Sequence, residues 1–246
     1  MKRVSQNPKK IMMISRDLSC PDFYSEMDKI LNFAVTEKTD ILLFALFSLD
    51  LDHMLNESFR TKLKEYTRKY KKFIVLEFTD LEDFQGNTVL CFNSGEMKVF
   101  YQWYGRSNDD DFWKEALLGE LPNRIFNGDT LLLICGELSL GLKVNKKTKL
   151  VEDPYNFMGW LKNNNIKYIL NPFHDTAVRY EVNYKKRELS CNGRKLVSVW
   201  NRNPKKHHNS VKPFQFFCDG YDKTNSIRWF ESFETRPDIK IAIAIA

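Results

Sequence analysis

The sequence has no long apolar run and contains little glycine or proline. No stretch reaches the roughly 18 consecutive apolar residues that a membrane-spanning helix needs, so no membrane partner is expected. The N-terminal segment MKRVSQNPKKIMMIS has only a very short apolar run, which argues against a secretory signal. Ten glycines and eight prolines exclude collagen-like and low-complexity architectures. With 43% hydrophobic residues in a chain of 246, the sequence predicts a soluble cytoplasmic protein with a substantial core.

Cysteine and histidine are also scarce. The five cysteines lie far apart without a C-x-x-C pair, and the four histidines show no finger-like spacing, so we expect no metal site and no cofactor. This pattern predicts free, mostly buried thiols in a reducing compartment. The formal net charge of +6 is small for the length of the chain, which argues against a nucleic-acid partner.

Short apolar runs alternate with amphipathic segments, which predicts α/β layers. Two of the runs flank an Asn-Ser-Gly-Glu turn and form a predicted hairpin, so the sheets should be mixed. We expect strands at residues 11–14, 41–49, 73–78, 88–92, 97–103, 130–135, 166–172, 195–201, 213–217 and 239–246, and helices at 24–35, 57–72 and 155–164. Residues 105–127 are expected to be irregular. No linker or repeat divides the chain, which predicts one domain over residues 1–246.

The run TLLLICGEL delivers Cys135 at the C-terminal end of an apolar strand and places Glu137 two residues later. This arrangement resembles the nucleophile motif of the nitrilase superfamily, the carbon–nitrogen hydrolases. A lone C-x-E is common, but here the surrounding segments follow the family's serial order. They are DILLFALFSL and NTVLCFNSGEMKVFYQW before the cysteine, and YILNPFHDT, KLVSVWN, HNSVKPFQFFCDG and IKIAIAIA after it. The resemblance covers nearly the whole chain, from Ile11 onward.

The resemblance implies a four-layer α-β-β-α sandwich with mixed sheets, a homodimer and a small amide or nitrile-like ligand. Cys135 matches the family's nucleophile, and the backbone N–H of Gly136 matches its oxyanion donor. The other two catalytic parts are missing, because Leu46 occupies the position of the glutamate base and Trp103 that of the lysine. Together with Tyr101, these two side chains are expected to line the pocket.

The first functional hypothesis is a degenerate enzyme that now acts as a binding or regulatory module. Neither leucine nor tryptophan can transfer a proton or stabilise an oxyanion, and each lost contribution is worth roughly 10²-fold or more in rate. A thiol left alone in an apolar pocket is inert. In that case Cys135 is a small buried apolar residue, Glu137 a strand-end carboxylate and His174 part of a surface turn.

The alternative hypothesis is an active cysteine-dependent amidohydrolase or acyltransferase with a relocated base. Glu137 and His174 are the candidate bases, and His174 follows a predicted strand end, where α/β folds place pocket residues. Arg106, three residues after Trp103, is the only nearby substitute for the lysine as oxyanion cation. This hypothesis requires an acid or an imidazole within hydrogen-bond reach of the Cys135 sulfur.

Overall fold

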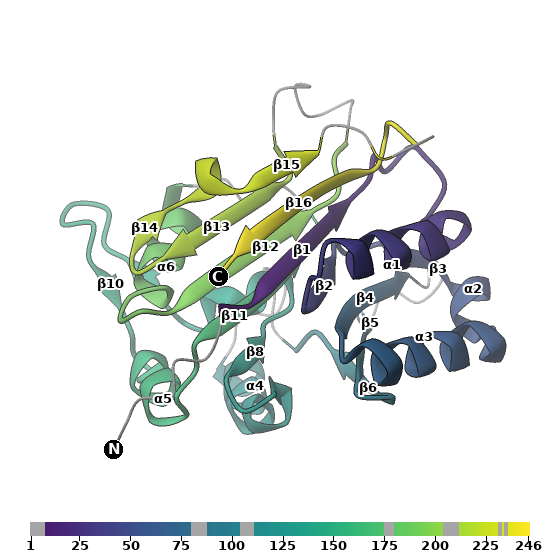
Figure 1. The fold of residues 1–246 in the computed structure, drawn as a ribbon. Coiled ribbons are helices and arrows are strands. Elements are labelled where there is room, and N and C mark those ends of the chain that lie inside the picture. Colours follow the sequence, from purple (N-terminus) through teal and green to yellow (C-terminus); the bar gives the residue numbers. More distant parts are fainter. Residues whose placement is uncertain are drawn as a thin grey trace, which may run out of the picture.

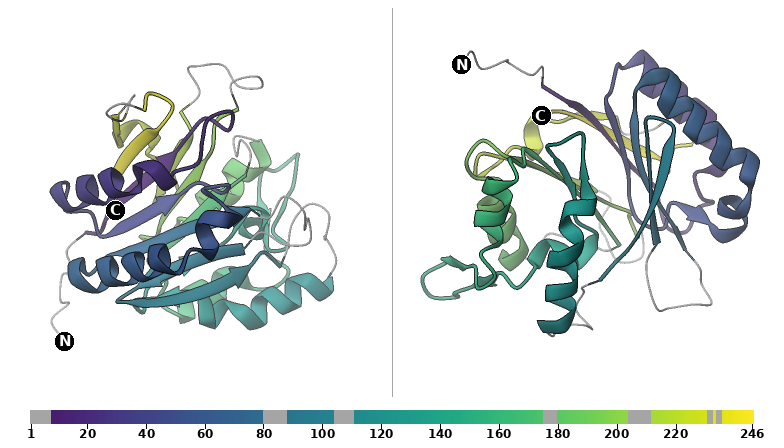
Figure 2. Two further views of the ribbon diagram at one scale, coloured as in Figure 1. Left: turned by 90° about the vertical axis from the view of Figure 1, so that its right-hand side faces the viewer. Right: turned by 90° about the horizontal axis from the view of Figure 1, so that it is seen from below.

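Two mixed β-sheets pack face to face in the computed structural model, and helices cover the outer face of each sheet (Figure 1). The structure describes residues 8–79, 88–103, 111–174, 180–203, 212–230, 233 and 236–246. The architecture is the predicted four-layer α-β-β-α sandwich, and the view from below shows both sheets between their helices (Figure 2). No helix within these ranges is long and apolar enough to cross a membrane.

The first sheet is built around three parallel strands, β1, β2 and β4, with antiparallel strands on both sides. Across the sheet the order is β15 (Arg228–Phe230), β16 (Lys240–Ile245), β1 (Lys10–Ser15), β2 (Ile41–Phe44), β4 (Phe73–Thr79), β5 (Thr88–Asn93) and β6 (Glu96–Tyr101), and β3 (Leu49–Asp50) pairs with β4. The chain crosses between the parallel strands through η1 (Tyr24–Glu26) and α1 (Met27–Thr36), and then through α2 (Leu51–Leu55) and α3 (Glu57–Tyr70). The apolar stripes of α1 and α3 pack on this sheet.

The second sheet is likewise mixed, with parallel β8, β11 and β12 at its centre. Its order is β14 (Tyr221–Asp222), β13 (Phe214–Cys218), β12 (Lys195–Trp200), β11 (Tyr168–Phe173), β8 (Thr130–Leu132) and β7 (Ile125–Phe126). The helices α4 (Asp111–Glu120), α5 (Phe157–Asn163) and α6 (Tyr180–Leu189) contribute apolar side chains to the cluster on its outer face. Short elements complete the layer: η2 (Leu121–Arg124), η3 (Cys135–Ser139), η4 (Thr224–Ser226), and the hairpin of β9 (Lys143–Val144) and β10 (Val151–Glu152).

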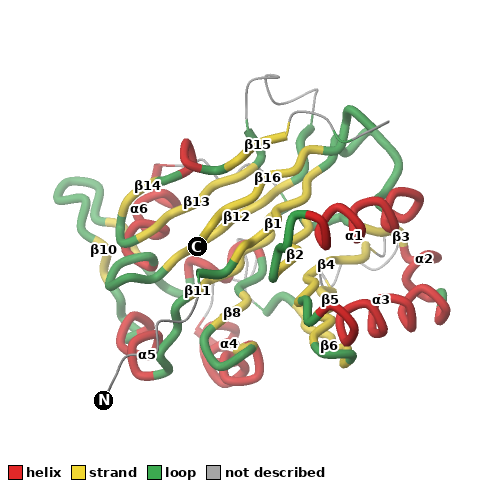
Figure 3. The backbone as a smooth tube through the Cα atoms, in the orientation of Figure 1, coloured by secondary structure: helices red, strands yellow, loops and turns green. Residues whose placement is uncertain are grey.

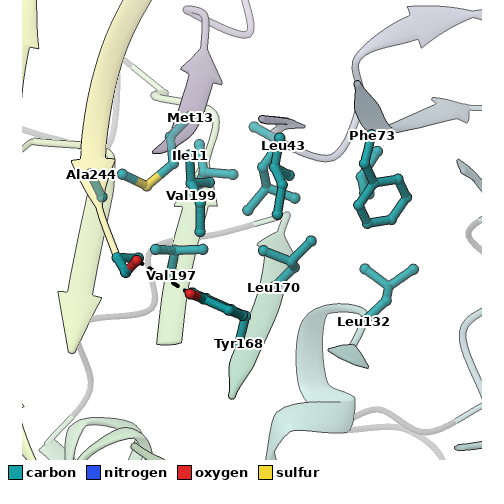
Figure 4. Packing of buried hydrophobic residues seen from close by; sticks show 14 of the residues in the cluster. Ile11, Met13, Leu43, Phe73, Leu132, Tyr168, Leu170, Val197, Val199 and Ala244 are labelled. Atoms are coloured by element: carbon teal, nitrogen blue, oxygen red, sulfur yellow. Dashed lines mark hydrogen bonds between the residues drawn. The ribbon is translucent and has the colours of Figure 1, made fainter. Parts of the chain in front are cut away.

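The period-two alternation of a strand assigns its side chains to different layers of the core. In β1, Ile11 and Met13 join the cluster between the two sheets, whereas Met12 and Ile14 join the cluster under the helices. Strands of the second sheet supply the facing side chains between the sheets, among them Val197 (Figure 4). Strands buried on both faces therefore appear in the sequence as continuous apolar runs.

Two of the predicted elements are wrong. The expected strand over residues 41–49 ends at Phe44, because the chain turns at Phe47, whose φ of 58° lies in the left-handed region. The expected irregular stretch over residues 105–127 contains α4, η2 and β7 (Figure 3). The predictions also omitted α6, whose polar sequence YEVNYKKREL buries only Lys186 and Leu189 fully.

The parallel strands of both sheets run in the same direction, so the sandwich has an amino end and a carboxyl end. At the amino end, Lys9 precedes β1 and forms an ion pair with Asp129, which precedes β8. At the carboxyl end, the Ser15 hydroxyl donates a hydrogen bond to the backbone carbonyl of Trp200 at 2.7 Å. Side chains that follow parallel strands of either sheet therefore meet at the carboxyl end, a usual position for ligand sites in α/β folds.

Candidate active site

Cys135 lies on a sharp turn between β8 and η3 at the carboxyl end. Its φ of 48° is left-handed, a conformation that costs a non-glycine residue on the order of 1–3 kcal/mol and occurs often at functional sites. The side-chain amide of Asn171 on β11 donates to the carbonyls of Leu133 and Cys135 at 2.6 and 3.2 Å. The hydroxyl of Ser198 in turn donates to the Asn171 amide oxygen at 3.3 Å. These buried hydrogen bonds hold the turn in its strained conformation.

The second sheet also supplies His174, directly after β11, and the first sheet supplies a carboxylate that faces it. Nε2 of His174 lies 2.9 Å from Oε1 of Glu77 on β4. The side chain of Glu77 is only 1% exposed and that of His174 is 17% exposed. The second carboxylate oxygen of Glu77 accepts the backbone N–H of Phe47. A buried carboxylate needs such partners, and here they are one ring nitrogen and one backbone N–H.

The ring of His174 also interacts with the thiol of Cys135, and this interaction affects its pKa. Burial lowers this pKa, but hydrogen bonds with Cys135 and Glu77 and the charges of both groups outweigh burial and raise the pKa to about 9. The imidazole therefore interacts with both Cys135 and Glu77. At neutral pH, a histidine with this pKa is an imidazolium.

The loop over residues 45–48 contributes backbone groups rather than an acid. Leu46 is fully buried in the cluster between the sheets, and its carbonyl accepts the side-chain amide of Asn201 at 2.5 Å. The ring of Phe47 packs against the His174 ring, with centroids 4.5 Å apart. The carboxylate that pairs with His174 thus comes from Glu77 of the neighbouring strand, and not from the position of Leu46.

Glu137 is fully buried, and both of its carboxylate oxygens accept hydrogen bonds. Oε2 accepts Nη1 of Arg124 at 2.5 Å and the N–H of Ile134 at 2.7 Å, and Oε1 accepts the N–H of Trp103 at 2.7 Å. Burial raises the pKa of Glu137, and Arg124 and the two backbone donors oppose that rise. The guanidinium also donates to the carbonyl of Tyr101 at 2.6 Å, whereas the Tyr101 side chain is 57% exposed. Glu137 thereby connects the end of β6 to the turn that carries the cysteine.

Replacing Arg124 by methionine should destabilise the protein by about 3–5 kcal/mol, because Glu137 would keep a buried charge without its cation. Urea unfolding measures the loss. The double variant Arg124→Met/Glu137→Gln should recover part of that stability, whereas Arg60→Met on α3 should change it by less than about 1 kcal/mol. A loss below 1 kcal/mol for Arg124→Met would contradict the assignment of a buried ion pair.

The remaining predicted site residues have different outcomes. Gly136 follows Cys135 at the first turn of η3 and is partly buried, and Arg106 lies outside the described residues. The sequence analysis missed Glu77. A signal for it was present, because Glu77 is the only charged residue in the apolar run FIVLEF. The five cysteines are free as predicted, but only Cys91 is fully buried and the other four are partly exposed.

Within the described part of the chain, one group of side chains has the spacing of a metal site. Ligand atoms of Asp22, Asp50 and His53 lie within 4.8 Å of one another. His53 Nδ1 already pairs with Asp22 at 2.6 Å, and the ring stacks on Tyr24. Arg16 adds a positive charge close to both carboxylates. The group is thus explained by its internal contacts, and its cationic neighbour disfavours a metal ion.

No protein-family model matches this sequence, and no curated protein matches it. Solved structures do match. The chain is similar to an amidase from Nesterenkonia sp., at 10% identity and a TM-score of 0.56, covering 99% of this chain and 92% of that one. A carbon–nitrogen hydrolase from Helicobacter pylori G27 matches at 11% identity and a TM-score of 0.54, with 96% and 88% of the chains covered. At these identities the matches confirm the predicted resemblance at the level of the fold.

A third similar structure is a variant of the Nesterenkonia sp. AN1 amidase, described as showing Michael addition of acrylamide at its active-site cysteine. It matches at 12% identity and a TM-score of 0.55, covering 96% of this chain and 92% of that one.

Proposed function

We propose that this chain, which has the fold of the nitrilase-superfamily amidases, is a cysteine-dependent hydrolase or acyltransferase that acts on carbon–nitrogen bonds. Cys135 is the nucleophile, His174 carries the proton, and Glu77 orients and neutralises the imidazolium. The observation that supports the proposal is the contact of the His174 ring with both Cys135 and Glu77. A nucleophile, a base and a group that orients the base form the minimal set for covalent catalysis.

In this proposal, acylation starts from a thiolate–imidazolium pair. The sulfur of Cys135 attacks the amide carbon, the C–S bond forms, and the carbonyl electron pair moves to oxygen. The N–H of Gly136 is the proposed donor to that oxyanion. The tetrahedral species collapses, the C–N bond breaks, and the leaving amine takes the proton from His174. Because Nε2 of His174 pairs with Glu77, Nδ1 is the ring nitrogen left to exchange a proton with the sulfur and the substrate.

Water or another amine then accepts the acyl group. The acceptor gives its proton to the neutral His174 ring as it attacks the thioester carbon, and the C–S bond breaks to return the thiolate. The product is a carboxylic acid with water and a new amide with an amine. A simple amide or nitrile-like ligand and a homodimer stay predictions from the resemblance, and a cytoplasmic location stays a prediction from the composition.

The second candidate function is the degenerate binding or regulatory module. The observation that favours it is the side chain of Leu46, which lies buried in the core where the resemblance places a glutamate base. The relay of Glu77 and His174 replaces that carboxylate in a different geometry, which is why we place the active enzyme first.

The experiment that tests the proposal is alkylation by iodoacetamide, followed by peptide mass spectrometry across a pH series. Labelling of Cys135 should be faster than that of Cys191 at neutral pH, because the thiolate is the reactive form. It should depend on His174 and decrease strongly in His174→Ala. Cys191 is an internal control, because burial and Glu188 raise its pKa and its labelling should need alkaline pH. Equal labelling of the two cysteines at neutral pH, or labelling of Cys135 that is unchanged in His174→Ala, would refute the proposed pairing of Cys135 with His174.

A further inference from the structure

A cavity of about 590 Å³ opens at the amino end of the sandwich, the end opposite Cys135. It is lined by the turn after β5 of the first sheet and by the segment before β8 of the second sheet, so both sheets contribute residues to its wall. The side-chain amide of Asn93 donates to the amide oxygen of Asn127 at 3.2 Å and joins these two segments. Viewed from below, the molecule presents this end (Figure 2). The volume falls within the range of small-molecule sites, and no residue of the proposed catalytic relay lines the cavity.

The cavity is lined by three cations, Lys9, Arg68 and Lys71, and by two carboxylates, Asp40 and Asp129, which leaves one positive charge in excess. Lys9 is paired with Asp129, and Asp40 accepts a backbone N–H of β1 at 2.7 Å. Arg68 and Lys71, at the C-terminal end of α3, also line the cavity. Neither has a hydrogen bond or an ion pair from its side chain to another residue in the described part of the chain. An unpaired guanidinium and an unpaired ammonium beside a concave surface favour an anionic ligand.

The guanidinium of Arg68, an exposed side chain, lies against a glycine at the cavity wall. The side chain lies against Gly95 in the turn between β5 and β6, and a Cβ on that glycine would lie 2.7 Å from Nε and 3.0 Å from Nη2. The N–H of Gly95 donates to the hydroxyl of Thr67 at 3.1 Å, which ties this turn to α3. A side chain at residue 95 would therefore crowd the guanidinium, and the glycine leaves room for it beside the cavity.

We propose that this amino-end cavity binds a small phosphate-bearing anion through Arg68 and Lys71. The planar guanidinium matches two phosphate oxygens, and the ammonium of Lys71 adds a point charge. Asn93 and Ser94, in the same wall, supply neutral donors. The cavity is larger than a phosphate ion alone, which leaves room for a small organic group on the ester oxygen. The proposal is independent of the chemistry at Cys135.

Isothermal titration with inorganic phosphate, adenosine monophosphate and adenosine tests it. Phosphate, the monoester or both should bind, more weakly as sodium chloride is added, and adenosine should not. Binding of phosphate alone identifies a free ion as ligand, whereas tighter binding of the monoester identifies a phosphorylated metabolite. Arg68→Gln and Lys71→Asn should each weaken binding about tenfold or more. Asparagine is chosen because Lys71 has a φ of 52°, which asparagine tolerates.

Lys69→Gln is the matched control, since it removes the same charge from the same helix at a residue that does not line the cavity. Its affinity should stay within roughly twofold of the wild type, because the exposed Lys69 does not line the cavity and its charge is screened by solvent. Unchanged iodoacetamide labelling of Cys135 in Arg68→Gln would show that the fold is intact. Absence of binding at millimolar phosphate and monoester, or an equal loss in Lys69→Gln, would overturn the proposal.

Discussion

Under the proposed mechanism, Cys135→Ala is expected to abolish turnover of short aliphatic amides, because it removes the sulfur that interacts with His174. The loss should reach about 10⁴-fold or the background rate of the assay, as for other nucleophiles that act as part of a unit. Release of ammonia from a series of amides measures turnover. Acrylamide should add to the sulfur of the wild-type protein, and intact-mass spectrometry detects that adduct.

The matched control is Cys191→Ser, which changes a partly exposed cysteine away from the relay and should keep full turnover. Turnover that survives in Cys135→Ala would exclude Cys135 as the nucleophile. If the wild-type protein neither turns over any amide nor forms the acrylamide adduct, the degenerate binding module is the better interpretation.

Glu77→Gln should have the second largest effect, a decrease of about 10²–10⁴-fold in kcat/KM. Glutamine keeps the size of the side chain but removes the negative charge that faces the imidazolium at 2.9 Å. The pKa of His174, raised to about 9 in the wild type, should then fall, because burial continues to favour the neutral ring. The alkaline limb of the pH–rate profile should therefore move from about pH 9 to lower pH.

The free energy of unfolding should also depend on the ionisation of His174. The folded-state pKa of His174 is raised from 6.5 to about 9, so its contribution is fully present below pH 6.5 and is lost as pH rises through 9. Urea unfolding between pH 6 and 10 should show this loss in the wild type and much less of it in Glu77→Gln. Glu152→Gln is the control, because Glu152 is exposed and lies outside the proposed site. It should match the wild type in the pH–rate profile and in the pH dependence of unfolding. An unchanged alkaline limb in Glu77→Gln would contradict the assigned role of Glu77.

Local pattern was enough to predict the layers and the position of the cysteine. The apolar run before Cys135 and the alternation of residues 239–246 depend only on neighbouring residues, and strand burial follows from that alternation. The wrong elements had local causes as well. The sequence of α4 mixes acidic and aromatic residues, so its pattern did not predict a helix that buries Leu117. The run ILLFALFSL contains no residue that indicates the left-handed turn at Phe47.

Only the tertiary structure decided which groups surround the sulfur. Glu77 lies 58 residues before Cys135 and in the other sheet, and His174 lies 39 residues after it. They meet because the parallel strands of both sheets end at one end of the sandwich, and this pairing leaves no trace in the spacing of the residues. Glu137, two residues from the cysteine, instead pairs with Arg124. The sequence thus pointed to Cys135 as the proposed nucleophile, and the packing of two sheets brought the imidazole of His174 and the carboxylate of Glu77 together.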